Sequence, residues 1–181
     1  MSMSKQAGVY AQALYDLGAE EGLEDRFLEE LKMLEKVFRD QPDYLRLLAA
    51  PNVSKKERCG LLQESIGGRV HPYVLHFVKL LTEKNRIRQF CDCCKEFEHL
   101  YNIAHGILPV QAVTAVVLSD AQQTRLTEKL SAITGKTVRL YNRIDPDCLG
   151  GVRLVYDGKL VDGTVAGSLN ALRDTLTATA L

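Results

Sequence analysis

Residues 149–165 read LGGVRLVYDGKLVDGTV and hold the clearest structural signal in this chain of 181 residues. Two apolar-rich segments, Gly151–Tyr156 and Lys159–Asp162, flank Asp157-Gly158, and an Asp-Gly pair in that position favours a two-residue hairpin turn. Gly150-Gly151 lacks the Lys-Ser/Thr of a phosphate loop, so we interpret it as a bulge or a close approach of two backbones. A helix is expected to follow, with one apolar face made of Val165, Leu169, Leu172 and Leu176. The stretch therefore predicts a strand–turn–strand–helix unit.

The residues just before this unit extend it into a small α/β domain. Residues 109–118 are rich in Val and Thr and predict a strand. A capping box at Ser119-Asp-Ala-Gln122 predicts the start of a helix whose inward side chains are Leu126, Leu130 and Ile133. A half-buried strand is predicted next from the alternation of Val138, Leu140 and Ile144 with polar residues, followed by a turn at Asp145-Pro-Asp147. We assign this domain to residues 107–181.

Residues 1–106 have helical periodicity, interrupted by Pro and Gly at short intervals. Six helices are expected there: around Tyr10–Leu17, around Phe27–Phe38, over Pro42–Leu48, from the Ser54–Glu57 capping box to Ile66, from Pro72 through Leu81, and over Ile87–Ala104. The fifth, with Val74–Leu81 apolar nearly all round, is expected to be the most buried. Short links between amphipathic helices favour a compact bundle. The predicted fold is mainly α: a six-helix bundle over 1–106, then the small α/β domain over 107–181.

Composition excludes some classes of function. The chain carries 23 Lys+Arg and 23 Asp+Glu, so its formal net charge is zero, and proteins that bind duplex nucleic acid usually present a basic face. The first residues lack the apolar stretch of a signal peptide, and no apolar run reaches the length of a membrane span. We expect a cytoplasmic protein.

The residues that could carry chemistry do not form a recognisable site. Cys91-Asp-Cys-Cys94 has no second Cys or His pair at zinc-ligand spacing, and we interpret Cys91 and Cys94 as small apolar residues on the helix seam, with Cys93 directed elsewhere. The four histidines follow no metalloprotease pattern, and no GxSxG segment is present. We predict no catalytic residue, no metal site and no cofactor. An enzyme in which Cys93 or Cys148 meets a histidine stays open as an alternative.

Several segments, taken in order, carry a resemblance to a known family. They are Tyr10-Ala-Gln-Ala-Leu14-Tyr, Phe77-Val-Lys-Leu-Leu-Thr-Glu-Lys-Asn-Arg86, Val138-Arg-Leu through Asp145, Leu149-Gly-Gly-Val and Leu160-Val-Asp-Gly-Thr-Val165. The chain resembles the delta subunit of F-type ATP synthase, the bacterial relative of the mitochondrial oligomycin-sensitivity-conferring protein. It departs from the family pattern at Gly18, where alanine is more frequent, at Thr164, where serine is usual, and in its cysteines around Cys91.

The resemblance implies a non-catalytic stator subunit that joins the catalytic head to the peripheral stalk and so supports proton- or sodium-driven ATP synthesis. One copy per complex would lie on the cytoplasmic face of the bacterial cell membrane, as a peripheral protein without insertion. The N-terminal helix of an alpha subunit would enter a groove between the first and fifth helices, and the second domain would engage the C-terminal end of a b subunit. Carried onto this sequence, the groove would use Tyr10, Leu14, Leu17, Val78 and Leu81. The alternative from another class is a helical nucleic-acid or regulatory binding module.

Overall fold

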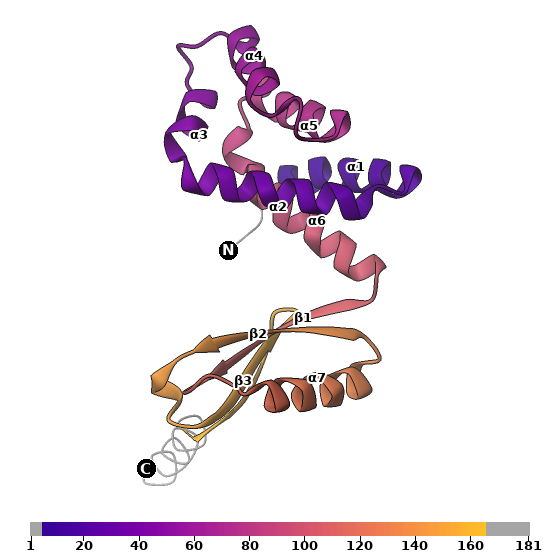
Figure 1. The fold of residues 1–181 in the computed structure, drawn as a ribbon, viewed down its shortest axis with the longest axis vertical. Coiled ribbons are helices and arrows are strands. Elements are labelled where there is room, and N and C mark those ends of the chain that lie inside the picture. Colours follow the sequence, from indigo (N-terminus) through magenta and orange to yellow (C-terminus); the bar gives the residue numbers. More distant parts are fainter. Residues whose placement is uncertain (1–4, 166–181) are drawn as a thin grey trace, which may run out of the picture. The chain divides into compact units, whose positions relative to one another are not determined.

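The computed structural model describes residues 5–165 and consists of two compact units, with the boundary between Tyr101 and Asn102 (Figure 1). The described part of the chain is mainly helical, with one small four-stranded sheet in the second unit. Within that part, no helix is both long and apolar enough to cross a membrane.

Seven α-helices occur among residues 5–165, and six of them lie between Lys5 and Ala104. These six are α1 (Lys5–Glu21), α2 (Glu24–Asp40), α3 (Pro42–Leu48), α4 (Lys55–Ile66), α5 (Pro72–Glu83) and α6 (Phe90–Ala104), with a short 3-10 helix, η1 (Ile87–Gln89), before α6. The predicted capping box at the start of α4 is confirmed: Ser54 Oγ accepts from the backbone N–H of Glu57, and the Glu57 carboxylate accepts from that of Ser54. Pro42 and Pro72 each occupy a first helical position, where a missing N–H costs nothing.

One hydrophobic core joins all six helices of the first unit. Its largest fully buried side chains include Phe27, Phe90 and Phe97, and the ring of Phe90 meets that of Phe38 edge to face at 5.0 Å between centroids. The expectation that Cys93 is directed away from this core is wrong, because its side chain is only 1% exposed. Cys94 is buried beside it, and its thiol faces the backbone carbonyl of Leu31 at 3.9 Å. Both cysteines therefore pack as small apolar residues.

The second unit contains a mixed sheet with strand order β2-β1-β3-β4. Its strands are β1 (Ile107–Thr114), β2 (Thr137–Ile144), β3 (Gly151–Tyr156) and β4 (Lys159–Thr164). β1 and β2 are parallel and are joined through α7 (Asp120–Thr134), whereas β1–β3 and β3–β4 are antiparallel. The predicted strand over 109–118 is displaced: β1 ends at Thr114, whose hydroxyl donates to the carbonyl of Val116 and so turns the chain.

The small core of this unit lies between α7 and the sheet. Leu108, Val110 and Val138 are buried there, with Leu130 of α7 packed against them. Leu126 and Leu130 are half-buried, but the inward placement of Ile133 is wrong, since that side chain is 81% exposed. Ile144, predicted to face inward, is also exposed. Of the predicted last helix, Leu169, Leu172 and Leu176 lie outside the described residues.

The hairpin prediction is confirmed. β3 and β4 are joined by Asp157-Gly158, where both residues have positive φ, 46° and 70°, as a type I′ turn requires. The predicted close backbone approach is also confirmed at Gly151, where a Cβ would lie 2.3 Å from the carbonyl oxygen of Gly163. Only glycine fits that position without displacing β4.

Candidate functional site: a groove between α1 and α5

A groove with a volume of about 580 Å³ lies between α1 and α5 in the first unit. From α1 it is lined by Tyr10, Ala13, Leu14 and Leu17, and from α5 by Tyr73, His76, Phe77, Lys79, Leu80 and Glu83. The spacing i, i+3, i+4, i+7 describes the four α1 residues and also the set Tyr73, His76, Phe77 and Leu80. Each helix therefore offers one continuous face to the groove.

The predicted groove residues separate into two groups. Tyr10, Leu14 and Leu17 line the groove. Val78 and Leu81 do not: both are 0% exposed and belong to the core of the first unit. An α-helix turns about 100° per residue, so each of them lies roughly that far around α5 from the groove residue that precedes it, Phe77 or Leu80.

Apolar side chains form most of the groove's surface, and charged or polar ones stand at its α5 edge. Leu80 is the most accessible large apolar side chain on the α5 side, at 40% exposure. At the edge, Lys79 Nζ donates to Gln63 Oε1 of α4 at 2.7 Å, and the Cys59 thiol approaches Glu83 Oε1 at 3.8 Å. An apolar floor beside a polar edge suits an amphipathic helix, which buries one face and leaves the other in water.

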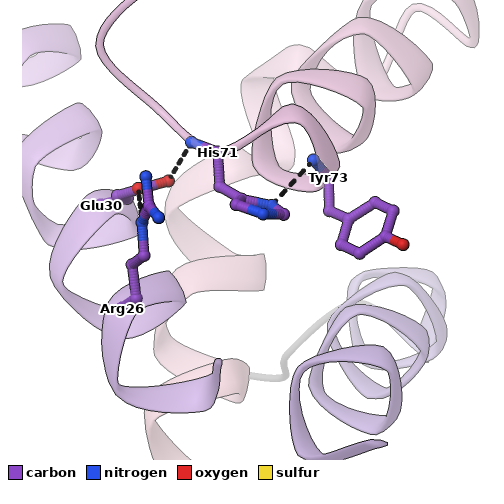
Figure 2. A network of polar contacts seen from close by, with 4 residues as sticks. All are labelled: Arg26, Glu30, His71 and Tyr73. Carbon is purple, nitrogen blue, oxygen red and sulfur yellow. Dashed lines mark hydrogen bonds and ion pairs between the residues drawn. The ribbon is translucent and has the colours of Figure 1, made fainter. Parts of the chain in front are cut away.

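A polar network anchors the first turn of α5 to α2 (Figure 2). Glu30 is nearly buried on α2; one carboxylate oxygen accepts from the backbone N–H of His71 at 2.7 Å, and the other from Arg26 Nε at 2.8 Å. His71 is the N-cap of α5, and its Nδ1 accepts from the backbone N–H of Tyr73 at 3.3 Å. The network therefore fixes where α5 begins, and with it the position of Tyr73 on the groove wall.

A cation also lies against the groove's aromatic lining. The guanidinium carbon of Arg86, just after α5, is 5.9 Å from the centre of the Tyr10 ring on α1. This separation is within the range of a cation–π contact. The contact joins α1 to the chain just after the end of α5.

The thiols of Cys91, Cys93 and Cys94 are not activated nucleophiles. Burial raises the pKa of the Cys93 thiol to about 12 and raises that of Cys94 as well, so both stay protonated near neutral pH. Desolvation, reinforced by Glu35, raises the pKa of the half-buried Cys91 too. In residues 5–165 no group of three or more His, Cys, Asp and Glu side chains is arranged to hold a metal ion.

Sequence reasoning missed seven groove residues, one on α1 and six on α5: Ala13, Tyr73, His76, Phe77, Lys79, Leu80 and Glu83. Because Val74–Leu81 is apolar nearly all round, hydrophobic periodicity does not show which face of α5 points toward the core and which toward the groove. His76 and Lys79 are the two polar residues within that run, and both line the groove. The neighbours of His76 on the same face, one turn to either side, are Tyr73 and Leu80, so the two polar residues mark the side of α5 that meets solvent.

Comparison with known proteins gives one consistent result. The family model described as ATP synthase delta (OSCP) subunit matches residues 7–176. The chain is 31% identical over 167 residues to ATP synthase subunit delta of Desulfitobacterium hafniense strain Y51, covering 92% of this chain and 93% of that protein. It is 30% identical over 178 residues to the subunit delta of Synechococcus elongatus, covering 98% and 99%. A chain of the mitochondrial ATP synthase hexamer of Toxoplasma gondii has the same fold, with a TM-score of 0.77 at 18% identity and coverage of 96% and 98%.

Proposed function

This chain belongs to the ATP synthase delta (OSCP) subunit family, and from that premise we propose that it is a non-catalytic stator subunit joining the catalytic head to the peripheral stalk. The first unit, residues 1–106, would hold the head, and the second, residues 107–181, would hold the stalk. Family membership favours this role over the alternative of a nucleic-acid or regulatory module.

The observation that carries the proposal is the groove between α1 and α5. We assign to it the N-terminal helix of an alpha subunit, entering with its apolar face toward Leu14, Leu17 and Leu80. Tyr10 and Tyr73 would supply amphipathic contact area, as tyrosines do in many interfaces. The edge formed by His76, Lys79 and Glu83 would meet the polar side of the entering helix.

For the second unit we propose contact with the C-terminal end of the b subunit. Among its described residues, large apolar side chains stay exposed on the β3–β4 hairpin and in the loop after β1; they are Val116, Val117, Leu160 and Val161. Apolar surface of this kind marks protein interfaces. Through alpha and b, one copy of the chain would be held at the cytoplasmic face of the bacterial membrane, supporting ion-driven ATP synthesis without inserting into the bilayer.

Titration calorimetry of the full chain with a synthetic N-terminal segment of the alpha subunit tests the proposal. The informative variant is Leu80→Asp. Complete burial of the exposed 40% of Leu80 removes about 70 Å² from water, which contributes about 2 kcal/mol at about 25 cal/mol per Å². A carboxylate at this position also adds a desolvation cost. We expect the affinity to fall by about tenfold or more.

Leu47→Asp is the matched control. Leu47 lies on α3, is 41% exposed and does not line the groove. It should leave the affinity unchanged, and both variants should keep the unfolding midpoint of the wild-type chain in urea. Equal affinity of Leu80→Asp and wild type would remove the groove assignment. Absence of any heat of binding with folded wild-type protein would remove the role itself.

A further inference from the structure

A second pocket in the first unit lies at the N-terminus of α4 and is lined by cations. It shares no lining residue with the groove. Its volume is about 620 Å³, and its lining comprises Ala49, Pro51, Val53, Ser54, Lys55, Arg58, Asn85 and Arg88. Three of these eight residues are positively charged and none is acidic. Lys55 and Arg88 are exposed at the mouth of the pocket, whereas Arg58 is only 3% exposed.

The environment of Arg58 is unusual for a buried cation. Its Nη1 donates to the carbonyl of Leu48 and to Asn85 Oδ1, both at 3.0 Å, and both acceptors are neutral. Its Nε is buried and has no hydrogen-bond partner. In residues 5–165, no carboxylate forms an ion pair with Arg58, Lys55 or Arg88. Burying a guanidinium without a counter-charge is costly, so an anion in the adjoining pocket would offset part of that cost.

Asn85 and Glu57, the residues next to Arg58, each have a hydrogen-bond partner of their own. Asn85 has a positive φ of 56°, a conformation that Asn tolerates better than most residues, and its side chain is tied to Arg58. The nearest carboxylate along the chain, Glu57, accepts from the backbone N–H of Ser54 and is engaged there. Ser54 is also the N-cap of α4, so the N-terminus of a twelve-residue helix lies at the pocket.

We propose that this pocket binds a phosphate group, as inorganic phosphate or as the phosphate of a small organic ester. Three cations, Lys55 and Arg58 from α4 and Arg88 from η1, suit an anion with several charged oxygens better than a single carboxylate. The pocket is also much larger than one oxyanion needs, which leaves room for the organic part of an ester. The site lies apart from the α1–α5 groove and does not depend on the stator role.

Amide NMR of the isotopically labelled full chain tests this site. Inorganic phosphate is titrated at constant pH, with sodium chloride keeping the ionic strength fixed. We expect saturable shifts that centre on Ser54, Asn85 and Arg88. Glycerol 3-phosphate, run in parallel, shows whether the ester binds more tightly than the free ion. Acetate is the carboxylate arm, and equal affinity for acetate would overturn the assignment to phosphate.

Exposed residues at the mouth provide the variants, because replacing Arg58 itself would also remove its ties to α3 and Asn85. Lys55→Gln and Arg88→Gln should each weaken phosphate binding by about fivefold, as expected for the loss of one charge-assisted contact. Lys129→Gln and Arg125→Gln, two exposed positions on α7, are matched controls and should leave the affinity unchanged. Shifts that never saturate, or equal weakening in all four variants, would mean non-specific attraction only and would overturn the proposal.

Discussion

Replacing Gly151 with alanine should unfold the second unit far more readily than the same change at Gly158. Both glycines belong to the same hairpin and have positive φ, 78° and 70°. Alanine adopts this backbone conformation only at a cost, so both substitutions introduce backbone strain. They differ in their neighbours. A Cβ at Gly158 meets nothing within 4 Å, whereas a Cβ at Gly151 would lie 2.3 Å from the carbonyl oxygen of Gly163 and 3.0 Å from the Cα of Thr164.

The size of the difference follows from these contacts. Positive φ alone costs alanine about 1 kcal/mol, and this is the whole expected effect at Gly158. At Gly151 the end of β4 must also move away, which breaks the pairing of Gly151 with Thr164 and the bond from the Val165 N–H to the Gly150 carbonyl. Each lost backbone bond costs about 1 kcal/mol, so the total is about 3 kcal/mol. For a domain of this size, that corresponds to a fall in Tm of about 10–25 °C.

The assay must report on each unit separately. We suggest thermal unfolding of the full chain followed by amide NMR, with signals from β1 and β3 for the second unit and from α2 and α5 for the first. Gly158→Ala should lower the midpoint of the sheet signals by only a few degrees, and neither variant should move the helical signals. Equal effects of the two substitutions would refute the close-approach argument, since only Gly151 faces another backbone.

Three smaller predictions concern single side chains. Glu30→Ala should destabilise the first unit by about 1–3 kcal/mol in urea titrations, because it leaves the backbone N–H of His71, the N-cap of α5, without its acceptor, whereas Glu29→Ala on the exposed face should be neutral. Cys91 should react with a thiol reagent near pH 8 faster than Cys93, whose burial raises its pKa to about 12; equal rates would contradict the packing. Hydrogen bonds from the threonine two residues on hold the pKa of Asp162 below its usual value, so its contribution to hairpin stability is present above the unfolded pKa and disappears as pH falls through the folded one; an Asp162→Asn variant should lack that acid-dependent loss in unfolding midpoints.

Local chemistry made much of the second unit predictable. An Asp-Gly pair between apolar segments permits few conformations, and the Ser119 capping box defines the start of α7 through two reciprocal hydrogen bonds. The errors occur where tertiary contacts override local preference. Ile133 continues the periodicity of α7, yet it is 81% exposed, so periodicity along the helix alone does not establish that a residue is covered. The early end of β1 depends on a hydroxyl of Thr114 that turns the chain, which strand propensity does not encode.

The groove illustrates a different reason for partial success. On α1, small residues and a few large apolar ones alternate with polar residues, so the sequence pattern shows which face of α1 meets α5. On α5, almost every residue from Val74 to Leu81 is apolar, and the helix has to satisfy the core and the groove at once. Periodicity then cannot separate the residues that face inward, such as Val78, from those that face the groove, such as Leu80.

Burial also determines which groove residue can serve as a probe of binding. Leu14 lines the groove, yet it is 5% exposed and belongs to the core. An aspartate there would place a carboxylate among buried side chains, at a cost of several kcal/mol. Leu14→Asp would therefore weaken helix binding by unfolding the bundle and would lower the urea midpoint of the first unit. Leu80→Asp should weaken binding at an unchanged midpoint, and only that combination distinguishes a docking surface from a core that happens to border it.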